Sequence, residues 1–205
     1  MDTIVYTDGA CSNNGQKGAK AGLGVYFGEG DMRNYCEKIK GKQTNNIAEV
    51  KAILKAAEIL KREILAGYPV EVYSDSRYAM RCCSEYGEKM ERAGWDKPIP
   101  NLELVKEAYH TFKNHPNVTF HYVAAHTGKD DEHSKGNDGA DKLANLAIGQ
   151  TQCEYADKPK RLLLKVPYDE KEKGKQLGTK WDAKKKKWYI MSNNKNKEMI
   201  LNLWG

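Results

Sequence analysis

Two aspartates in this chain directly follow segments that alternate as strands do. Asp8 comes after residues 3–7 (Thr-Ile-Val-Tyr-Thr), and Asp75 comes after residues 70–74 (Val-Glu-Val-Tyr-Ser). β-Branched and aromatic residues in such an alternation predict strands. We therefore expect Asp8 and Asp75 to lie at strand ends and to point out of the same edge of a sheet.

Two further acids lie on the apolar sides of predicted helices. Glu49 precedes Ile53 by four residues, and Asp141 precedes Ala144 by three, so each carboxylate shares a face with apolar side chains. A charge buried there needs a partner or a bound cation. Most acids lie on solvated surfaces, and for any single one of these four that alternative stays open. Together, the four acids predict a metal site.

Five short motifs surround these acids in a fixed order along the chain. They are Thr-Asp-Gly-Ala-Cys at 7–11, Thr-Asn-Asn-Ile-Ala-Glu at 44–49, Tyr-Ser-Asp-Ser at 73–76, His-Thr-Gly at 126–128 and Asn-Asp-Gly-Ala-Asp-Lys-Leu-Ala at 137–144. With these motifs, residues 1–150 resemble type 1 ribonuclease H. The resemblance implies an α/β fold, a mixed five-stranded sheet flanked by helices, and endonucleolytic hydrolysis of the RNA strand of RNA–DNA hybrids. A catalytically silent hybrid-binding protein on the same fold is the alternative, and a DNA-cutting integrase or resolvase is disfavoured by the Asn-Asn pair at 45–46.

The resemblance also assigns roles in the reaction. Asp8, Glu49, Asp75 and Asp141 would hold two Mg²⁺ ions, with Mn²⁺ as the alternative, because both metals favour oxygen ligands. Asp8 would bridge the ions, and Asp141 would hold the ion on the side of the attacking water, so that cleavage leaves 5′-phosphate and 3′-hydroxyl ends. His126 matches the catalytic-loop histidine of the family and would shuttle protons or help product release.

The resemblance places substrate contacts around the acids, where the 2′-hydroxyl distinguishes RNA from DNA. Lys42 and Thr44 match a pocket that binds a phosphate of the DNA strand, and Arg77 stands where the family often has an uncharged groove contact. Asparagines at these positions also suit turns and helix caps, and the two roles are compatible. The residues expected to contact the hybrid are Gly9, Ala10, Cys11, Asn14, Lys42, Thr44, Asn45, Asn46, Ser76, Arg77 and Asn137.

Two segments depart from the family pattern. Residues 85–95, where many members carry a basic handle, are rich in acids, so we do not expect them to grip a duplex and we expect Trp95 to pack. Residues 126–137 form a long polar linker that changes how His126 reaches the metals. The other four histidines, His110, His115, His121 and His133, have no counterpart in the motifs and are predicted to be structural or exposed.

The cysteines and the hydropathy of the chain suggest its surroundings. Five cysteines, Cys11, Cys36, Cys82, Cys83 and Cys153, show no metal-binding spacing, and their odd number without a signal peptide favours a reducing intracellular compartment, the cytoplasm or nucleus. No apolar stretch approaches the roughly 20 residues that cross a bilayer, so no membrane partner is expected. We expect a monomer.

The net charge of +6 is distributed unevenly. Residues 158–205 hold 14 Lys and Arg against 5 Asp and Glu, a net charge of +9, whereas residues 1–157 hold 20 against 23, a net charge of −3. We therefore divide the chain into a catalytic domain (1–150), a linker (151–160) and a small basic α+β module (161–205). The charge predicts that the module binds nucleic acid, hybrid or duplex, although a merely solvated surface would look the same.

The C-terminal module contains the motifs Val-Pro-Tyr at 166–168, Lys-Trp-Asp at 180–182 and Lys-Trp-Tyr at 187–189. They resemble an uncharacterised module appended to primases and other nucleic-acid enzymes. Aromatic rings between lysines can stack on bases while the lysines contact phosphates, or the rings can form the core of so small a unit. The residues predicted to bind nucleic acid are Lys180, Trp181, Lys184, Lys185, Lys186, Lys187, Trp188 and Tyr189.

Periodicity and turn residues give the expected elements. In the catalytic domain they are strands at 3–8, 22–27, 33–40, 70–74 and 117–123 and helices at 46–65, 76–92, 102–115 and 136–149; in the module they are strands at 162–168 and 187–190 and helices at 169–177 and 195–204.

Overall fold

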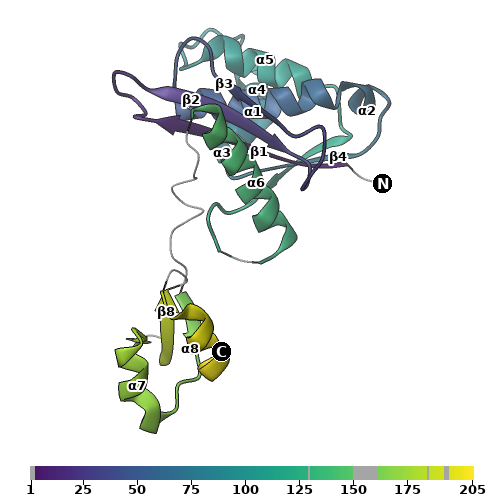
Figure 1. The fold of residues 1–205 in the computed structure, drawn as a ribbon. Coiled ribbons are helices and arrows are strands. Elements are labelled where there is room, and N and C mark those ends of the chain that lie inside the picture. Colours follow the sequence, from purple (N-terminus) through teal and green to yellow (C-terminus); the bar gives the residue numbers. More distant parts are fainter. Residues whose placement is uncertain (1–2, 129, 150–160, 184, 192–193) are drawn as a thin grey trace. The chain divides into compact units, whose positions relative to one another are not determined.

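The computed structural model describes residues 3–128, 130–149, 161–183, 185–191 and 194–205. The chain forms two compact units, residues 1–156 and 157–205 (Figure 1). The predicted linker, Cys153 and Lys184 lie outside the described residues. No helix within the described ranges has the length and apolar character needed to span a membrane.

The first unit contains the predicted five-stranded mixed sheet, in the order β3-β2-β1-β4-β5. Its strands are β1 (Thr3–Ser12), β2 (Lys20–Tyr26), β3 (Tyr35–Lys38), β4 (Val70–Ser74) and β5 (Val118–Tyr122). β1, β2 and β3 form an antiparallel meander, while β4 runs parallel to both β1 and β5. The parallel pairing of β1 with β4 ends at Thr7 and Ser74, so Asp8 and Asp75, which follow these two residues, lie at the same edge of that pairing.

Helices cover both faces of this sheet. They are α1 (Asn45–Ile59), α2 (Lys61–Leu65), α3 (Arg77–Cys83), α4 (Glu85–Arg92), α5 (Leu102–Phe112) and α6 (Glu132–Ala147). A side chain at Gly9 in β1 would meet α1, whereas side chains at Gly22 and Gly24 in β2 would meet α6. Gly9 is paired with Leu23, between these two glycines, and neighbouring residues of a strand point to opposite faces. α1 and α6 therefore pack on opposite faces of the sheet.

The tertiary structure changes several predicted boundaries. β1 does not end at Asp8, because β2 pairs with it as far as Ser12. The predicted helices at 46–65 and 76–92 are each interrupted, at Leu60 and Ser84, which leave helical geometry. The predicted strand at 33–40 begins only at Tyr35.

The predicted linker between His126 and Asn137 is also wrong. α6 begins at Glu132, because the carboxylate of Asp131 caps it by accepting a hydrogen bond of 2.9 Å from the backbone of Ser134. The second half of the expected linker is thus the first part of a helix, which includes Asn137.

The second unit is the predicted small α+β module. Its elements are β6 (Arg161–Leu164), the 3₁₀ turn η1 (Tyr168–Glu170), α7 (Lys171–Gln176), β7 (Lys180–Asp182), β8 (Lys187–Met191) and α8 (Lys197–Trp204). The strands form an antiparallel sheet in the order β6-β8-β7, and β7 is a strand that the sequence did not predict. The core consists of Leu164, Ile190, Ile200 and Trp204.

Candidate active site

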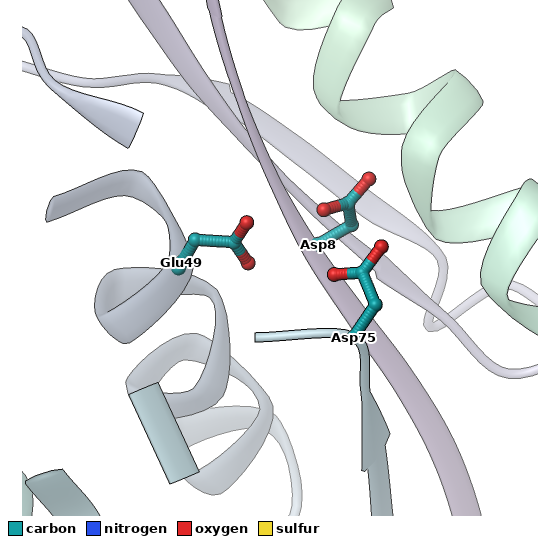
Figure 2. Close-up of side chains that lie close together, drawn as sticks. All are labelled: Asp8, Glu49 and Asp75. Atoms are coloured by element: carbon teal, nitrogen blue, oxygen red, sulfur yellow. The ribbon is translucent and has the colours of Figure 1, made fainter. Parts of the chain in front are cut away.

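Three carboxylates meet where β1, β4 and α1 come together. Oxygens of Asp8, Glu49 and Asp75 all lie within 4.8 Å of one another, and Figure 2 shows Glu49 reaching from α1 toward the two aspartates. Asp8 is the first residue of β1 beyond its parallel pairing with β4, which ends at Thr7 and Ser74. Asp75 directly follows that pairing, so the shared register of the two strands brings the aspartates together.

Glu49 reaches the aspartates because α1 packs unusually close to β1. A Cβ at Gly9 would lie 2.3 Å from the backbone nitrogen of Glu49 and 2.7 Å from the carbonyl carbon of Ala48. Any side chain at this position would push the helix outward. The absence of a side chain at Gly9 therefore sets the distance between Glu49 and Asp8, the residue that precedes Gly9 in β1.

Asp141 approaches from α6, on the opposite face of the sheet. A Cβ at Gly24 would lie 2.1 Å from the carbonyl oxygen of Ala140, so the glycine lets α6 pack directly on β2. Asp141 is buried, and Asn145, one turn later, donates a hydrogen bond of 2.8 Å to its carboxylate. The charge of Asp141 is close enough to raise the pKa of Asp8, Glu49 and Asp75.

The pKa values of Asp8, Glu49 and Asp75 are raised mainly because burial disfavours their charged forms. Repulsion by the neighbouring acids raises them further. One hydrogen bond to each acid opposes this effect: Gly9 N to Asp8 at 2.7 Å, Asn45 Nδ2 to Glu49 at 3.1 Å and Asn137 Nδ2 to Asp75 at 3.3 Å. The site concentrates negative charge that the protein only partly compensates.

This environment fits a divalent cation. Glu49 Oε2 is buried and has no hydrogen-bond partner among the residues that the structure describes, although its companion oxygen accepts from Asn45. Such an orphaned oxygen is costly unless something binds it. An all-carboxylate set suits Mg²⁺ or Mn²⁺.

His126 lies at the rim of the same cavity, which has a volume of about 790 Å³. It is exposed and has a left-handed backbone with φ of 50°. Its charge lowers the pKa of Asp75, although burial of Asp75 has the larger, opposite effect. The cavity is lined by Asp8, Gly9, Ala10, Cys11, Ser12, Asn13, Asn45, Glu49, Asp75, His126, Asp141, Asn145 and Ile148.

Four of the predicted substrate-binding residues, Gly9, Ala10, Cys11 and Asn45, line this cavity. Asn14 lies beside them, since its side-chain oxygen accepts a hydrogen bond of 3.2 Å from the backbone of Asn45. Asn46 is exposed on the first turn of α1. The hybrid contacts expected of these residues remain predictions.

The remaining predicted contacts lie outside the cavity lining. Thr44 and Ser76 cap α1 and α3 through their hydroxyls, and Arg77 stacks over the ring of Tyr122 at 3.8 Å. Lys42 lines a separate groove of about 480 Å³. Asn137 is only 1% exposed and holds Asp75, which gives it a positioning role.

Four residues of the cavity lining were missed by the sequence argument: Ser12, Asn13, Asn145 and Ile148. Asn145 follows Asp141 by four residues on α6, a spacing that places two helical side chains side by side and could have indicated it. Asn13 sits in a turn with φ of 50°, and no periodic signal marks it.

The packing roles expected for two aromatic residues are confirmed. Trp95 is half-buried against the core and meets His110 edge-on at 6.1 Å. His133 stacks on Tyr73 at 4.2 Å and its Nδ1 lies 3.2 Å from the hydroxyl of Tyr6. The acids of α4 form ion pairs with neighbouring bases: Glu85 with Arg81, Glu88 with Arg92, and Glu91 with His110 and Lys113.

Comparison with known protein families assigns both units. Residues 1–148 match the family model described as RNase H, and residues 161–200 match a domain of unknown function (DUF5710). The solution structure of the PFV RNase H domain has 22% identity and a TM-score of 0.56, covering 71% of this chain and 93% of that one. The structure of LC9-RNase H1 has 22% identity and a TM-score of 0.53, covering 75% of this chain and 76% of that one. These two similarities concern the fold.

Sequence relatives agree with the family model. The ribonuclease H of Ruthia magnifica subsp. Calyptogena magnifica is 38% identical over 149 residues, which cover 71% of this chain and 94% of the relative. Ribonuclease H1 of Mus musculus is 31% identical over 73% of this chain, which spans 51% of the mouse protein. The chain therefore belongs to the ribonuclease H family, metal-dependent endonucleases that hydrolyse the RNA strand of RNA–DNA hybrids.

Proposed function

We propose that residues 1–148 cleave the RNA strand of a bound hybrid at the carboxylates of Asp8, Glu49, Asp75 and Asp141, leaving 5′-phosphate and 3′-hydroxyl ends. The observation that carries this proposal is the convergence of three carboxylates within 4.8 Å, with one buried oxygen of Glu49 left without a hydrogen bond from the described part of the chain. A fold that only bound hybrids would gain nothing from this costly arrangement.

Four carboxylates suit two divalent ions, since two such ions would balance their full negative charge. Asp8 would be the shared ligand, as the family resemblance implies, and its charge interacts with those of Glu49, Asp75 and Asp141. The chemistry supplied by bound Mg²⁺, or Mn²⁺, would be activation of the attacking water and stabilisation of the departing 3′ oxygen.

Side chains of the protein itself then hold the carboxylates of this site in position. Asn45 and Asn137 each fix one carboxylate oxygen, which orients Glu49 and Asp75 for binding a cation. His126, exposed at the rim, can reach solvent and substrate and so can move a proton between them.

Selection for RNA would occur at the polar side of the cavity. The backbone of Gly9, Ala10 and Cys11 and the side chain of Asn45 offer donors and acceptors that suit a 2′-hydroxyl. This hydroxyl is absent from DNA, so a strand that lacks it would lose these hydrogen bonds.

A basic groove could hold the second strand. Lys40, Lys42 and Lys51 line it together with Asn101 and one acid, Glu103, and the excess of positive charge suits phosphate oxygens. We propose that this groove grips the backbone of the DNA strand, as expected for Lys42.

The test is cleavage of an end-labelled RNA–DNA hybrid with Mg²⁺, beside all-RNA and all-DNA duplexes of the same sequence. We expect the wild-type chain to cut only the hybrid, and Asp8→Asn to lose on the order of 10³-fold in rate while it still binds the hybrid. Equal cutting by both proteins would refute the site, and binding without any cutting would support the catalytically silent alternative.

A further inference from the structure

We infer that the C-terminal unit carries a binding site for unpaired nucleotides, formed by the exposed indole of Trp181 and the lysines of the β7–β8 turn. This site goes beyond hydrolysis of hybrids, and its occupancy does not depend on the carboxylate cluster. The argument rests on which rings the module buries, how Trp181 is supported and where the lysines lie.

The structure separates the aromatic rings of the module into core and surface. Trp204 is 5% exposed and belongs to the core, and Trp188 packs against that core from β8. Trp181 is 51% exposed. The small core is thus complete without the ring of Trp181, and an exposed indole forgoes the apolar burial that usually stabilises so large a side chain.

Trp181 is nevertheless held in place. It pairs directly with Trp188 across the antiparallel strands, and the two rings meet at 5.5 Å with an angle of 64° between their planes. The contact with Trp188 therefore supports the Trp181 ring on one side, while about half of the residue stays exposed. A ring that is already fixed loses little entropy when a base stacks on it.

Tyr189 does not offer a second open ring. It pairs with Lys180, next along β7 from Trp181, so it points to the other face of the sheet. There the guanidinium of Arg161 lies over its ring at 4.7 Å, and Arg161 also bonds to Asp182 at 3.0 Å. Of the three rings predicted to stack on bases, Trp181 is the one that remains available.

The charge around Trp181 suits phosphates. Residues 161–205 hold 12 Lys and Arg against 5 Asp and Glu, a net charge of +7. Lys185, Lys186 and Lys187 are exposed in and beside the β7–β8 turn, which Asp182 fixes by accepting a hydrogen bond of 3.0 Å from the backbone of Lys185. The ion pairs within the described part of the module are Arg161–Asp182, Lys173–Glu170 and Lys175–Glu172. None of these pairs within the described residues involves Lys185, Lys186 or Lys187.

The combination favours single strands over duplexes and over acidic proteins. Lysines alone would bind any polyanion, but an acidic peptide has no base to stack on the indole. In a duplex the bases already stack on one another, whereas unpaired nucleotides expose a ring face to an aromatic platform. Single-stranded RNA and single-stranded DNA share this chemistry.

The experiment uses the full chain in EDTA, so that binding is measured without cleavage. Fluorescence anisotropy of short labelled oligo-U and oligo-dT reports affinity over a range of salt concentrations. We expect Trp181→Ala to weaken binding about 5- to 100-fold and Trp181→Phe to keep most of the affinity. Tyr168→Ala, which removes another exposed ring of the module (82% exposed), should change affinity less than twofold.

A matched pair of charge variants tests the lysines. Replacing Lys185, Lys186 and Lys187 by Gln should lower the slope of log affinity against log salt by about 2, because each phosphate contact contributes about 0.7 for single strands. The same replacement at Lys171, Lys173 and Lys175 on α7 removes equal charge and should lower the slope less.

Three results would overturn the inference. The first is unchanged affinity of Trp181→Ala for both oligonucleotides. The second is an equal loss in the two lysine variants. The third is displacement of the oligonucleotide by polyglutamate as readily as by unlabelled strand, which would identify a general polyanion surface.

Discussion

The side-chain amide of Asn137, on α6, donates a hydrogen bond of 3.3 Å to the carboxylate of Asp75, at the end of β4. Asn137 is almost fully buried, and within the described ranges its side-chain oxygen has no hydrogen-bond partner. This contact joins the last helix of the catalytic unit to the central sheet at the carboxylate cluster. It also lowers the pKa of Asp75, against the larger effect of burial.

Replacement of Asn137 by Ala should therefore impair chemistry more than binding. We expect kcat to fall about 10-fold or more with little change in KM, as is common when a residue that orients a metal ligand is removed. Without the amide, the pKa of Asp75 rises further, so the acidic limb of the pH–rate profile should move to higher pH. Steady-state kinetics across pH measure both effects.

Asn117→Ala is the matched control for this variant. Asn117 donates comparable hydrogen bonds, of 3.1 and 2.9 Å, to the carbonyls of Ile64 and Tyr68, away from the carboxylates. It should cost stability without moving the pH–rate profile. If both variants shift the profile equally, Asn137 acts through general stability.

Gly9→Ala should separate Glu49 from the aspartates. The new methyl group would overlap the backbone of α1 at 2.3 Å, a contact that a rigid helix cannot relieve by side-chain movement. We expect a loss of about 1–3 kcal/mol in the free energy of unfolding and a drop in Mg²⁺-dependent cleavage. Thermal melts and cleavage rates test this.

Gly30→Ala serves as the comparison for Gly9→Ala. Gly30 lies in the β2–β3 turn with φ of 73° and open space around it. Its replacement should cost only the strain of a left-handed backbone, about 1 kcal/mol, and leave cleavage unchanged. Retained activity in Gly9→Ala would show that close packing of α1 is dispensable.

Asp8→Asn should stabilise the metal-free protein while it abolishes cleavage. The asparagine oxygen can still accept the hydrogen bond from Gly9, but the buried charge and its repulsion of Glu49 and Asp75 are gone. A gain of roughly 1 kcal/mol corresponds to about 2–4 °C in Tm for a chain of this size. Melting in EDTA measures the change, and a lower Tm would contradict the proposed repulsion.

The stability difference between these two proteins should depend on pH. In the folded chain, burial and the neighbouring acids raise the pKa of Asp8 well above its ordinary value of 3.8. Below pH 3.8 the Asp8 carboxyl is protonated in both the folded and the unfolded chain. As the pH rises above 3.8, the unfolded chain releases this proton before the folded chain does. The free energy of unfolding of the wild type therefore falls until the pH passes the raised pKa of the folded state. The advantage of Asp8→Asn should therefore grow toward neutral pH.

Mg²⁺ should reverse this trend. A cation that binds only the folded carboxylates stabilises the wild-type chain by mass action, and it binds less at low pH because protons compete for the ligands. We expect added Mg²⁺ to raise the wild-type Tm at neutral pH and to have a smaller effect on Asp8→Asn. Equal shifts in both proteins would argue against binding at this cluster.

Local pattern was sufficient for much of this description. Alternation and helical spacing located the five strands and the helices that carry Glu49 and Asp141, and the ordered motifs identified the family. These signals are readable because strand and helix periodicities depend on a residue's near neighbours alone. The predicted ends of strands and helices were wrong where contacts with residues far away in the sequence set them. At Asp8, for example, pairing with β2 extends β1 to Ser12.

The sequence by itself determined which side chains could form the metal site and that a basic unit follows them. Only the tertiary structure decided that Asn137 is buried against Asp75, and that Trp181 is exposed while Trp188 packs against the core. Both outcomes depend on which surfaces pack across long separations in the chain. Whether a side chain is buried depends on these long-range contacts, and the type and spacing of residues in the sequence do not specify such contacts.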